Sequence, residues 1–169
     1  GPPNIEWVPA AVANQSEWIG RRILGIVLHD TEGSLSATLS EFTNPLVPKS
    51  AHYVIGKSGR VIQMVKDADI AYHAKGTWAL LPDCLKALPD PMFCSRLNAY
   101  TIGIELELLA TDPDGSFTDL QYQKLGQLLV SLTTKHPEIR LTREWVKGHG
   151  ELQSDRTDPR GLDFFRLGL

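Results

Sequence analysis

Three side chains far apart in the sequence have the types and the setting of metal ligands. His149 lies between two glycines, and Asp158 follows it on a short connection. His29 comes at the end of the apolar run 23–28. Two imidazoles and one carboxylate suit a zinc ion with one open position, whereas structural zinc is usually closed by four ligands. Because either histidine alone would more often be structural, the prediction depends on the three residues together.

A fourth candidate is Glu105, which lies in the otherwise apolar segment 102–106. A carboxylate is costly to bury without a partner. Side chains of a strand alternate between its faces, so Glu105 and Glu107 are expected on the same face. Two interpretations stay open, a solvent-facing edge strand or a general base. Zinc lowers the pKa of a bound water from about 15.7 towards ~7, so that a nearby carboxylate can accept its proton.

Short apolar segments predict the strands that position these residues. Residues 23–28 are typical of a buried strand, and a loop is expected over 30–34. Segments 51–55 and 60–65 flank the sequence Gly-Lys-Ser-Gly and predict a hairpin. Further segments expected to be extended are 100–106 and, as a strand or a turn, 145–148.

Two helices complete the expected fold. The first begins at residue 35 and ends before Pro45, because its apolar residues recur on one face. The second covers residues 118–135, where Thr118 and Gln121 fit a capping box and four leucines form a buried stripe. Strands and helices intermingle, which predicts an α/β fold with a mixed central β-sheet flanked by helices. Residues 1–169 are expected to form a single domain.

The segment 74–97 follows neither pattern. Prolines interrupt it, and a long connection in a compact domain usually has a function, such as forming one wall of a binding cleft. It contains the only cysteines of the chain, Cys84 and Cys94, whose spacing is not that of a zinc site. They either form a disulfide, worth about 2–3 kcal/mol, or remain two free thiols.

The composition excludes several classes of function. A chain of 169 residues with 42% hydrophobic and 22% charged residues is typical of a globular domain. No apolar run reaches the ~20 residues of a membrane span. No signal peptide is visible, and Gly1-Pro2 fits a scar of tag cleavage. The net charge of −3 argues against a nucleic-acid binder. The basic residues of the last third form a solvated surface or weakly attract an anionic polymer, and a monomer is expected.

Five segments, in the same order, resemble the zinc-dependent N-acetylmuramoyl-L-alanine amidases of the type 2 family. They are residues 26–29, 50–55, 71–74, 98–107 and 148–159. Each motif alone is weak, but five in the same order are strong, and the resemblance spans about residues 23 to 165. The family includes phage lysozymes with amidase activity, bacterial peptidoglycan-recycling amidases and animal peptidoglycan recognition proteins.

The resemblance implies a role for each candidate residue. It implies that zinc is bound by His29, His149 and Asp158, and that Glu105 is the catalytic carboxylate. Arg156 stands two residues before the last ligand, where the family commonly has a lysine that stabilises the oxyanion. Arginine keeps the positive charge but presents a planar fork instead of a compact ammonium.

One position distinguishes this chain from the phage members of the family, and two others each allow two roles. Ala51 stands where the phage lysozymes have a catalytic tyrosine, so the chain is nearer to amidases that use Glu as the base. His73 corresponds to a position near the substrate cleft and is expected to bind substrate or to pack. Asn98 anchors a substrate peptide or shapes the entry to the strand. His52 is expected to be structural, and His136 to be exposed to solvent.

The implied activity is zinc-dependent hydrolysis of the amide bond between N-acetylmuramic acid and L-alanine in peptidoglycan, by a phage endolysin or a bacterial cell-wall amidase. A cytosolic enzyme that recycles soluble anhydro-muropeptides and a non-catalytic peptidoglycan-binding module are the alternatives. Members that only bind typically lack a metal ligand, whereas this chain keeps all three ligands and Glu105. The expected partners are peptidoglycan or muropeptides.

Overall fold

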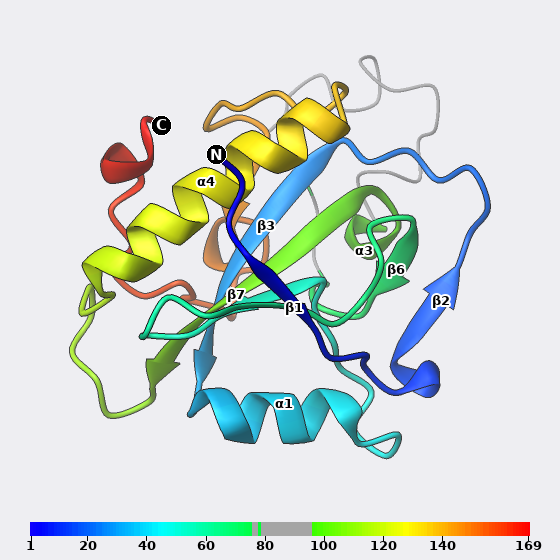
Figure 1. The fold of residues 1–169 in the computed structure, drawn as a ribbon, viewed down its shortest axis with the longest axis horizontal. Coiled ribbons are helices and arrows are strands. Elements are labelled where there is room, and N and C mark those ends of the chain that lie inside the picture. The colour runs from blue at the N-terminus through cyan, green and yellow to red at the C-terminus, as the bar shows by residue number, and fades with distance from the viewer. Residues whose placement is uncertain (76–77, 79–95) are drawn as a thin grey trace.

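A mixed sheet is the centre of the computed structural model, which describes residues 1–75, 78 and 96–169 (Figure 1). Within these residues the sheet has six strands in the order β1-β5-β4-β7-β3-β8. The strands are β1 (Ile5–Trp7), β3 (Gly25–Glu32), β4 (Tyr53–Ile55), β5 (Val61–Gln63), β7 (Thr101–Leu109) and β8 (Val146–Gly148). Only β4 and β5 pair antiparallel in this sheet. A separate antiparallel pair consists of β2 (Gln15–Glu17) and β6 (Asp69–Ala71).

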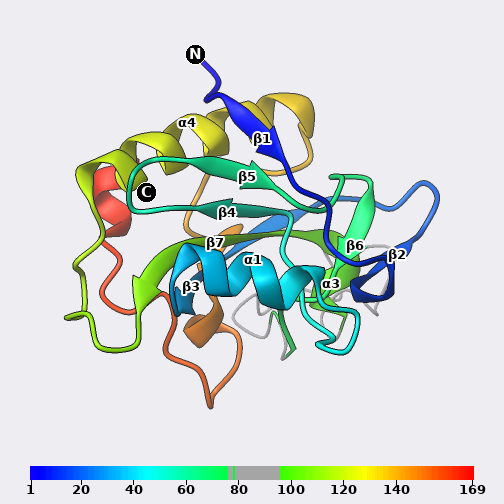
Figure 2. The ribbon, with the colours of Figure 1, turned by 60° about the horizontal axis from the view of Figure 1, so that its bottom comes forward.

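Helices cover both sides of the sheet. The α-helices are α1 (Leu35–Thr43), α3 (Leu97–Tyr100) and α4 (Asp119–Lys135), and short 3₁₀ turns are η1 (Val12–Asn14), η3 (His149–Glu151) and η4 (Phe164–Leu167). Helices α1 and α4 lie on opposite sides of the sheet (Figures 1 and 2). The predicted α/β class with a mixed central sheet flanked by helices is therefore confirmed. Among the described helices, none is long and apolar enough to cross a bilayer.

The alternation of side chains along β3 and β7 separates the apolar core from the polar residues. One face packs against the leucines of α4, and its members are Ile26, Leu28, Ile104, Leu106 and Leu108. Val27 faces the other side and belongs to a different apolar cluster. His29 and Glu105 follow the same alternation and are neighbours in register across the two strands. The sheet therefore holds both residues on the side away from α4.

Strand β3 is longer than predicted. The loop expected over residues 30–34 is wrong at its start, because Asp30 and Glu32 pair with β7 and the strand ends at Glu32. His29 thus lies inside the strand and not at its end. The physical reason is a distant partner: the buried carboxylate of Asp30 accepts a hydrogen bond from the backbone N–H of Arg160 at 2.8 Å. The polar residues at 30–34 suggest a loop, and nothing near them in the sequence indicates that Arg160 will bond to Asp30.

The other predicted elements are present with shifted bounds. The predicted hairpin is confirmed as β4 and β5, and its turn needs Gly59, whose φ is +88°. The strand predicted over 100–106 begins one residue later, since Tyr100 ends α3, and runs to Leu109. Strands β1, β2 and β6 were not expected, because three residues are too few to show a period. Cys84 and Cys94 lie outside the described residues.

A buried polar cluster supports the strands beside the site. The guanidinium of Arg21 donates hydrogen bonds to the carbonyls of Thr101 and Asp67, at 3.2 and 2.6 Å. His52 is fully buried, and its Nδ1 accepts from the N–H of Gly103 at 3.0 Å. Burial, together with the charge of Arg21, lowers the pKa of His52 to about 3. His52 is therefore a neutral, buried residue that supports the strands, in agreement with the structural role predicted for it.

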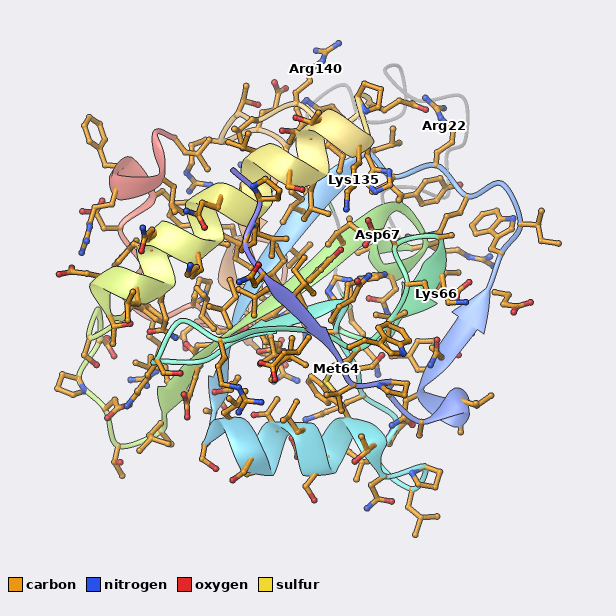
Figure 3. The ribbon with its side chains drawn as sticks, viewed as in Figure 1. Arg22, Met64, Lys66, Asp67, Lys135 and Arg140 are labelled. Atoms are coloured by element: carbon orange, nitrogen blue, oxygen red, sulfur yellow. The ribbon has the colours of Figure 1, made fainter. Side chains whose placement is uncertain are left out.

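His136 differs from its prediction. Its ring was expected in solvent, but the side chain is only 24% exposed and Nε2 lies 2.8 Å from a carboxylate oxygen of Asp67. Asp67 lies near the C-terminal end of α4 (Figure 3). The prediction was wrong because Asp67 comes from the connection between β5 and β6, far from His136 in the sequence.

The start of α4 is tied to the sheet by one side chain. The predicted capping box of Thr118 and Gln121 is confirmed. Gln121 is 1% exposed, and its Nε2 also donates to the carbonyls of Ile55 at 3.2 Å and Glu107 at 2.9 Å. One amide therefore joins the helix to both β4 and β7.

Replacing this amide tests how much it contributes to stability. Gln121→Ala is expected to lower the free energy of unfolding by about 2–3 kcal/mol, because the backbone N–H of Thr118 loses its acceptor and the carbonyls of Ile55 and Glu107 lose a donor. Gln123→Ala, at an exposed position of the same helix, is expected to change it by less than about 0.5 kcal/mol. Urea denaturation measures both, and equal effects of the two substitutions would contradict this account.

Candidate active site

The structure brings together the three residues predicted as metal ligands. Nδ1 of His29 lies 3.1 Å from Nδ1 of His149 and 3.1 Å from Oδ2 of Asp158, and the latter two atoms are 3.3 Å apart. All three residues are buried. A tetrahedral zinc ion with bonds of about 2.0–2.1 Å keeps its ligand atoms about 3.3 Å apart. The donor types and their separations therefore fit zinc.

Glycines allow the loop that carries Asp158 to lie against His149. Strand β8 pairs with β3, and His149 follows it at the start of η3. A Cβ at Gly150 would lie 2.8 Å from the carbonyl oxygen of Arg156, and one at Gly148 would lie 2.9 Å from Cδ of Pro159. The N–H of Gly150 also donates to the carbonyl of Asp158 at 2.9 Å. Larger residues at these positions would push the carboxylate away from the histidines.

A second contact anchors the chain just beyond Asp158. The backbone N–H of Arg160 donates to Asp30, and the guanidinium of Arg160 donates to Asp114 at 2.7 Å and to the carbonyl of Leu109 at 2.9 Å. These contacts attach the loop to the ends of β3 and β7. Asp30 was not among the residues predicted from the sequence, although a carboxylate directly after the apolar run and His29 is a signal that could have indicated it.

The orientation of the His149 ring follows from its outer partner. Its Nε2 lies 2.7 Å from Oε1 of Gln153, whose Nε2 donates to the carboxylate of Asp155 at 2.8 Å. A carboxylate only accepts, so the amide oxygen of Gln153 must face the ring and accept its N–H. His149 is therefore protonated on Nε2 and presents the lone pair of Nδ1 to the site, as metal-binding histidines do.

The protonation states at the site are those that metal binding needs. Burial lowers the pKa of His29, although the carboxylate of Asp158 opposes the shift. Burial alone would raise the pKa of Asp158, but the adjacent rings of His149 and His29 hold it below its ordinary value. At neutral pH the site thus offers a neutral imidazole and an ionised carboxylate. Nitrogen ligands favour zinc over magnesium or calcium, which prefer oxygen.

Glu105 lies beside the three predicted ligands without a hydrogen-bond partner among the described residues. It is half-buried, and its Oε2 is shielded from solvent with no hydrogen bond to the described residues. Burial raises the pKa of Glu105 well above its ordinary value, and the charges of Asp158 and Asp30 raise it further. A carboxylate with a raised pKa binds a proton more readily than an ordinary one, which is typical of groups that transfer protons in active sites.

Glu107 has a different task although it shares the face of Glu105, as the alternation predicts. Its carboxylate accepts hydrogen bonds from the backbone N–H groups of Leu35 and Lys57, each at 2.8 Å. It therefore connects the start of α1 and the hairpin turn to β7. Of the two carboxylates, only Glu105 is free to take part in chemistry.

A cleft of about 120 Å³ opens above the ligands and Glu105. Arg156 lines it with an exposed side chain that forms no ion pair in the part of the chain that the structure describes. Lys49 is a second exposed cation of the cleft. Lys49 was not predicted from the sequence, because nothing in its neighbourhood distinguishes it from a surface lysine.

The two residues predicted to bind substrate occupy different places. His73 lines the cleft, with its Nδ1 2.9 Å from Nε2 of His29. Asn98 does not line it: its Oδ1 accepts the backbone N–H groups of His73 and Ala74 at 3.1 and 2.9 Å. Asn98 borders a separate hollow with Trp18. A substrate contact of Asn98 stays a prediction, while its contact with the backbone of His73 is a feature of the fold.

The ligand geometry leads to a direct test. Zinc added to the metal-free protein is expected to raise the thermal midpoint, because a ligand that binds only the folded chain stabilises it, by about 2.7 kcal/mol at about a hundredfold excess over Kd. Magnesium is expected to have no such effect. Asp158→Ala should lose most of the zinc-dependent shift. Thermal unfolding followed by circular dichroism measures it, and an equal shift in Asp158→Ala would rule out this ligand set.

Comparison with known proteins adds relatives to this geometry. A family model described as N-acetylmuramoyl-L-alanine amidase matches residues 19–161. N-acetylmuramoyl-L-alanine amidase A of Achromobacter lyticus is 29% identical over 90% of this chain and 84% of its own length. The 1,6-anhydro-N-acetylmuramyl-L-alanine amidase AmpD of Haemophilus influenzae is 31% identical over 68% of this chain. The match spans 53% of that relative, about half of its length.

Solved structures share the fold. A selenomethionine derivative of AmpD has a TM-score of 0.73 at 23% identity, and the match covers 97% of this chain and 92% of the other. AmpDh3 from Pseudomonas aeruginosa has a TM-score of 0.68 at 26% identity, over 88% of this chain and 59% of the other. An endolysin amidase from Clostridium intestinale has a TM-score of 0.66 at 17% identity, over 99% and 94%.

Proposed function

The chain belongs to the N-acetylmuramoyl-L-alanine amidase family, and from this membership we propose that it cleaves its amide bond as a zinc hydrolase with His29, His149 and Asp158 as the ligands. It is a peptidoglycan amidase, which hydrolyses the bond between N-acetylmuramic acid and L-alanine. The observation that supports zinc is the buried triangle of two imidazole nitrogens and one carboxylate oxygen, at 3.1–3.3 Å, on the floor of a cleft.

The metal and the protein have separate tasks in this proposal. When bound, zinc would supply a Lewis acid that activates water and polarises the carbonyl, and its charge would offset the carboxylates that raise the pKa of Glu105. The ligands hold their positions through Gln153 behind His149 and through Arg160 beyond Asp158. The cleft above them is partly open, so that a substrate can reach them.

Glu105 moves the protons of the reaction. Its free Oε2 can take a proton from the attacking water while a carbon–oxygen bond forms at the amide carbonyl. When the carbon–nitrogen bond breaks, the same atom can return the proton to the amine of L-alanine, so that the carboxylate is regenerated. Its register beside His29 places it next to the ligands without making it one of them.

Arg156 would stabilise the negative charge that develops on the carbonyl oxygen. Its side chain lines the cleft and has no ion pair among the described residues, so that its charge is not neutralised by a protein carboxylate. Donors aimed at a developing oxyanion contribute much of the rate enhancement in acyl-transfer enzymes. The loop that carries Asp158 also carries Arg156 two residues earlier, and both residues line the cleft.

The names of the relatives differ in how closely they specify the substrate. The Achromobacter lyticus relative is named for the general amidase activity, and the Haemophilus influenzae relative for 1,6-anhydro-muramyl substrates. We propose intact peptidoglycan as the main substrate and soluble anhydro-muropeptides as the second candidate. Mass spectrometry of the products from intact sacculi and from soluble anhydro-muropeptides compares them, and release of stem peptides from the soluble form alone would overturn the main proposal.

Removing the proposed base tests the mechanism. Glu105→Gln is expected to keep zinc and the fold but to lower turnover by about a hundredfold or more, because the proton acceptor is lost. Glu107→Gln is the matched control on the same strand face. It should reduce thermal stability through its contacts with α1 and the hairpin turn, while turnover per folded molecule stays close to wild type. Turnover on sacculi and zinc content measure both, and the reverse pattern would assign the base to Glu107.

Arg156 is tested by removing and restoring its charge. Arg156→Ala is expected to raise the barrier by about 2.7–4 kcal/mol, as the loss of one oxyanion donor does, with unchanged zinc content and thermal midpoint. Arg156→Lys should recover much of the activity, since it keeps the charge. Arg140→Ala, at an exposed residue that projects from the surface (Figure 3), is the control. Wild-type turnover in Arg156→Ala would reduce Arg156 to a surface residue.

A further inference from the structure

We propose that His73 is a positioning residue: through a directed chain of hydrogen bonds that ends at the carbonyl of Leu97, it fixes the proton of His29 on Nε2 and leaves Nδ1 free to bind metal. The inference rests on the proposed zinc site. It concerns a residue that the sequence analysis expected either to bind substrate or to pack. The chain consists of His29, His73, the hydroxyl of Thr101 and the carbonyl of Leu97.

The direction of the chain is set at its far end. A carbonyl oxygen only accepts, and the hydroxyl oxygen of Thr101 lies 2.6 Å from the carbonyl oxygen of Leu97. Thr101 therefore donates its single proton there. The same hydroxyl oxygen lies 3.2 Å from Nε2 of His73 and has only acceptor capacity left for it. Nε2 of His73 must then carry the proton of that ring.

The remaining nitrogens follow by exclusion. The ring nitrogens of His73 contact His29 and Thr101, and no carboxylate among the described residues bonds to the ring to favour its charged form. A neutral imidazole has one N–H, so Nδ1 of His73 is an acceptor. It lies 2.9 Å from Nε2 of His29, which therefore donates. The unprotonated Nδ1 of His29 then faces His149 and Asp158 at 3.1 Å each.

Packing holds the His73 ring in this chain. A Cβ built at Gly103 would come within 2.5 Å of the ring, so a glycine is needed at this point of β7 to make room for it. The backbone N–H of His73 is held by Oδ1 of Asn98 at 3.1 Å. The ring also packs edge-on against His29, with centroids 5.1 Å apart. Neighbouring strand and loop residues thus determine where Nδ1 lies.

This arrangement differs from a substrate contact in a way that can be measured. Both ring nitrogens of His73 are occupied, by His29 and by Thr101, so neither is available to a substrate. A hydrogen-bond partner behind a metal-bound histidine fixes its ring and raises its basicity, and its loss typically costs about 10–100-fold in metal affinity. A substrate-binding residue would instead change KM and leave zinc affinity unchanged.

The experiment compares two replacements of His73 in the whole chain. His73→Phe keeps a planar ring against Gly103 but offers no acceptor to His29. His73→Asn is smaller, but its amide oxygen can stand near the place of Nδ1 and accept. We expect zinc affinity, measured by competition with a chromophoric chelator, to fall about 10–100-fold in His73→Phe and to stay closer to wild type in His73→Asn. Thr101→Val should also weaken binding, because it removes the acceptor that orients His73.

The outcomes separate this inference from the proposed function. Wild-type protein without zinc affinity would refute the zinc site itself. Zinc bound by the wild type and equally well by His73→Phe and Thr101→Val would refute only the positioning role, as would tighter binding by His73→Phe than by His73→Asn. If His73→Phe does not fold, the nearly isosteric Thr101→Val decides, with unchanged affinity overturning the inference. His136→Asn is the control: His136 contacts Asp67, away from the site, and its replacement is expected to leave zinc affinity unchanged.

Discussion

The close approach of two imidazole nitrogens and a carboxylate oxygen is the constraint on which the rest of this structure depends. Atoms with lone pairs at 3.1–3.3 Å repel one another unless a cation lies between them. The protein therefore has to hold each of the three proposed ligands from behind. Gln153 orients His149, His73 orients His29, and the backbone attachment of Arg160 to Asp30 keeps the loop of the third ligand in place.

The sheet makes this arrangement possible by dividing its faces. Strands β3, β7 and β8 run parallel, so that the polar residues of β3 and β7 lie close to the turn that follows β8. On the opposite face, the apolar residues of the same strands form a core with α4. The burial of that face stabilises the strands, and their pleat then determines the direction of His29 and Glu105. The alternation of side chains along β3 and β7 thus produces the apolar core on one face of the sheet and the polar site on the other.

The site also concentrates negative charge at a cost to stability. Asp30, Glu105 and Asp158 approach one another closely enough to raise the pKa of Glu105 and of Asp30, for both of which burial is the largest cause. Such groups are typical of active sites, where function is maintained against local stability. Arg156 and Lys49 are the cations of the cleft and remain exposed. This leaves positive charge available to a substrate at the rim and negative charge available to a metal at the floor.

The sequence by itself determined what depends on neighbouring residues along the chain. The capping box of α4, the hairpin of β4 and β5 and the alternation that separates Glu105 from the core all follow from local patterns. The three predicted ligands were chosen by their residue types and by the order of the motifs that contain them. Only the tertiary structure decided which polar groups meet. Strand β3 continues through Asp30 because the backbone N–H of Arg160 donates a hydrogen bond to the Asp30 carboxylate. His136 is half-buried because its ring contacts the carboxylate of Asp67. His73 lies behind His29 because Gly103, on another strand, leaves space for its ring. These partners are distant in the sequence, and hydrogen bonds between such segments leave no periodic signal in it.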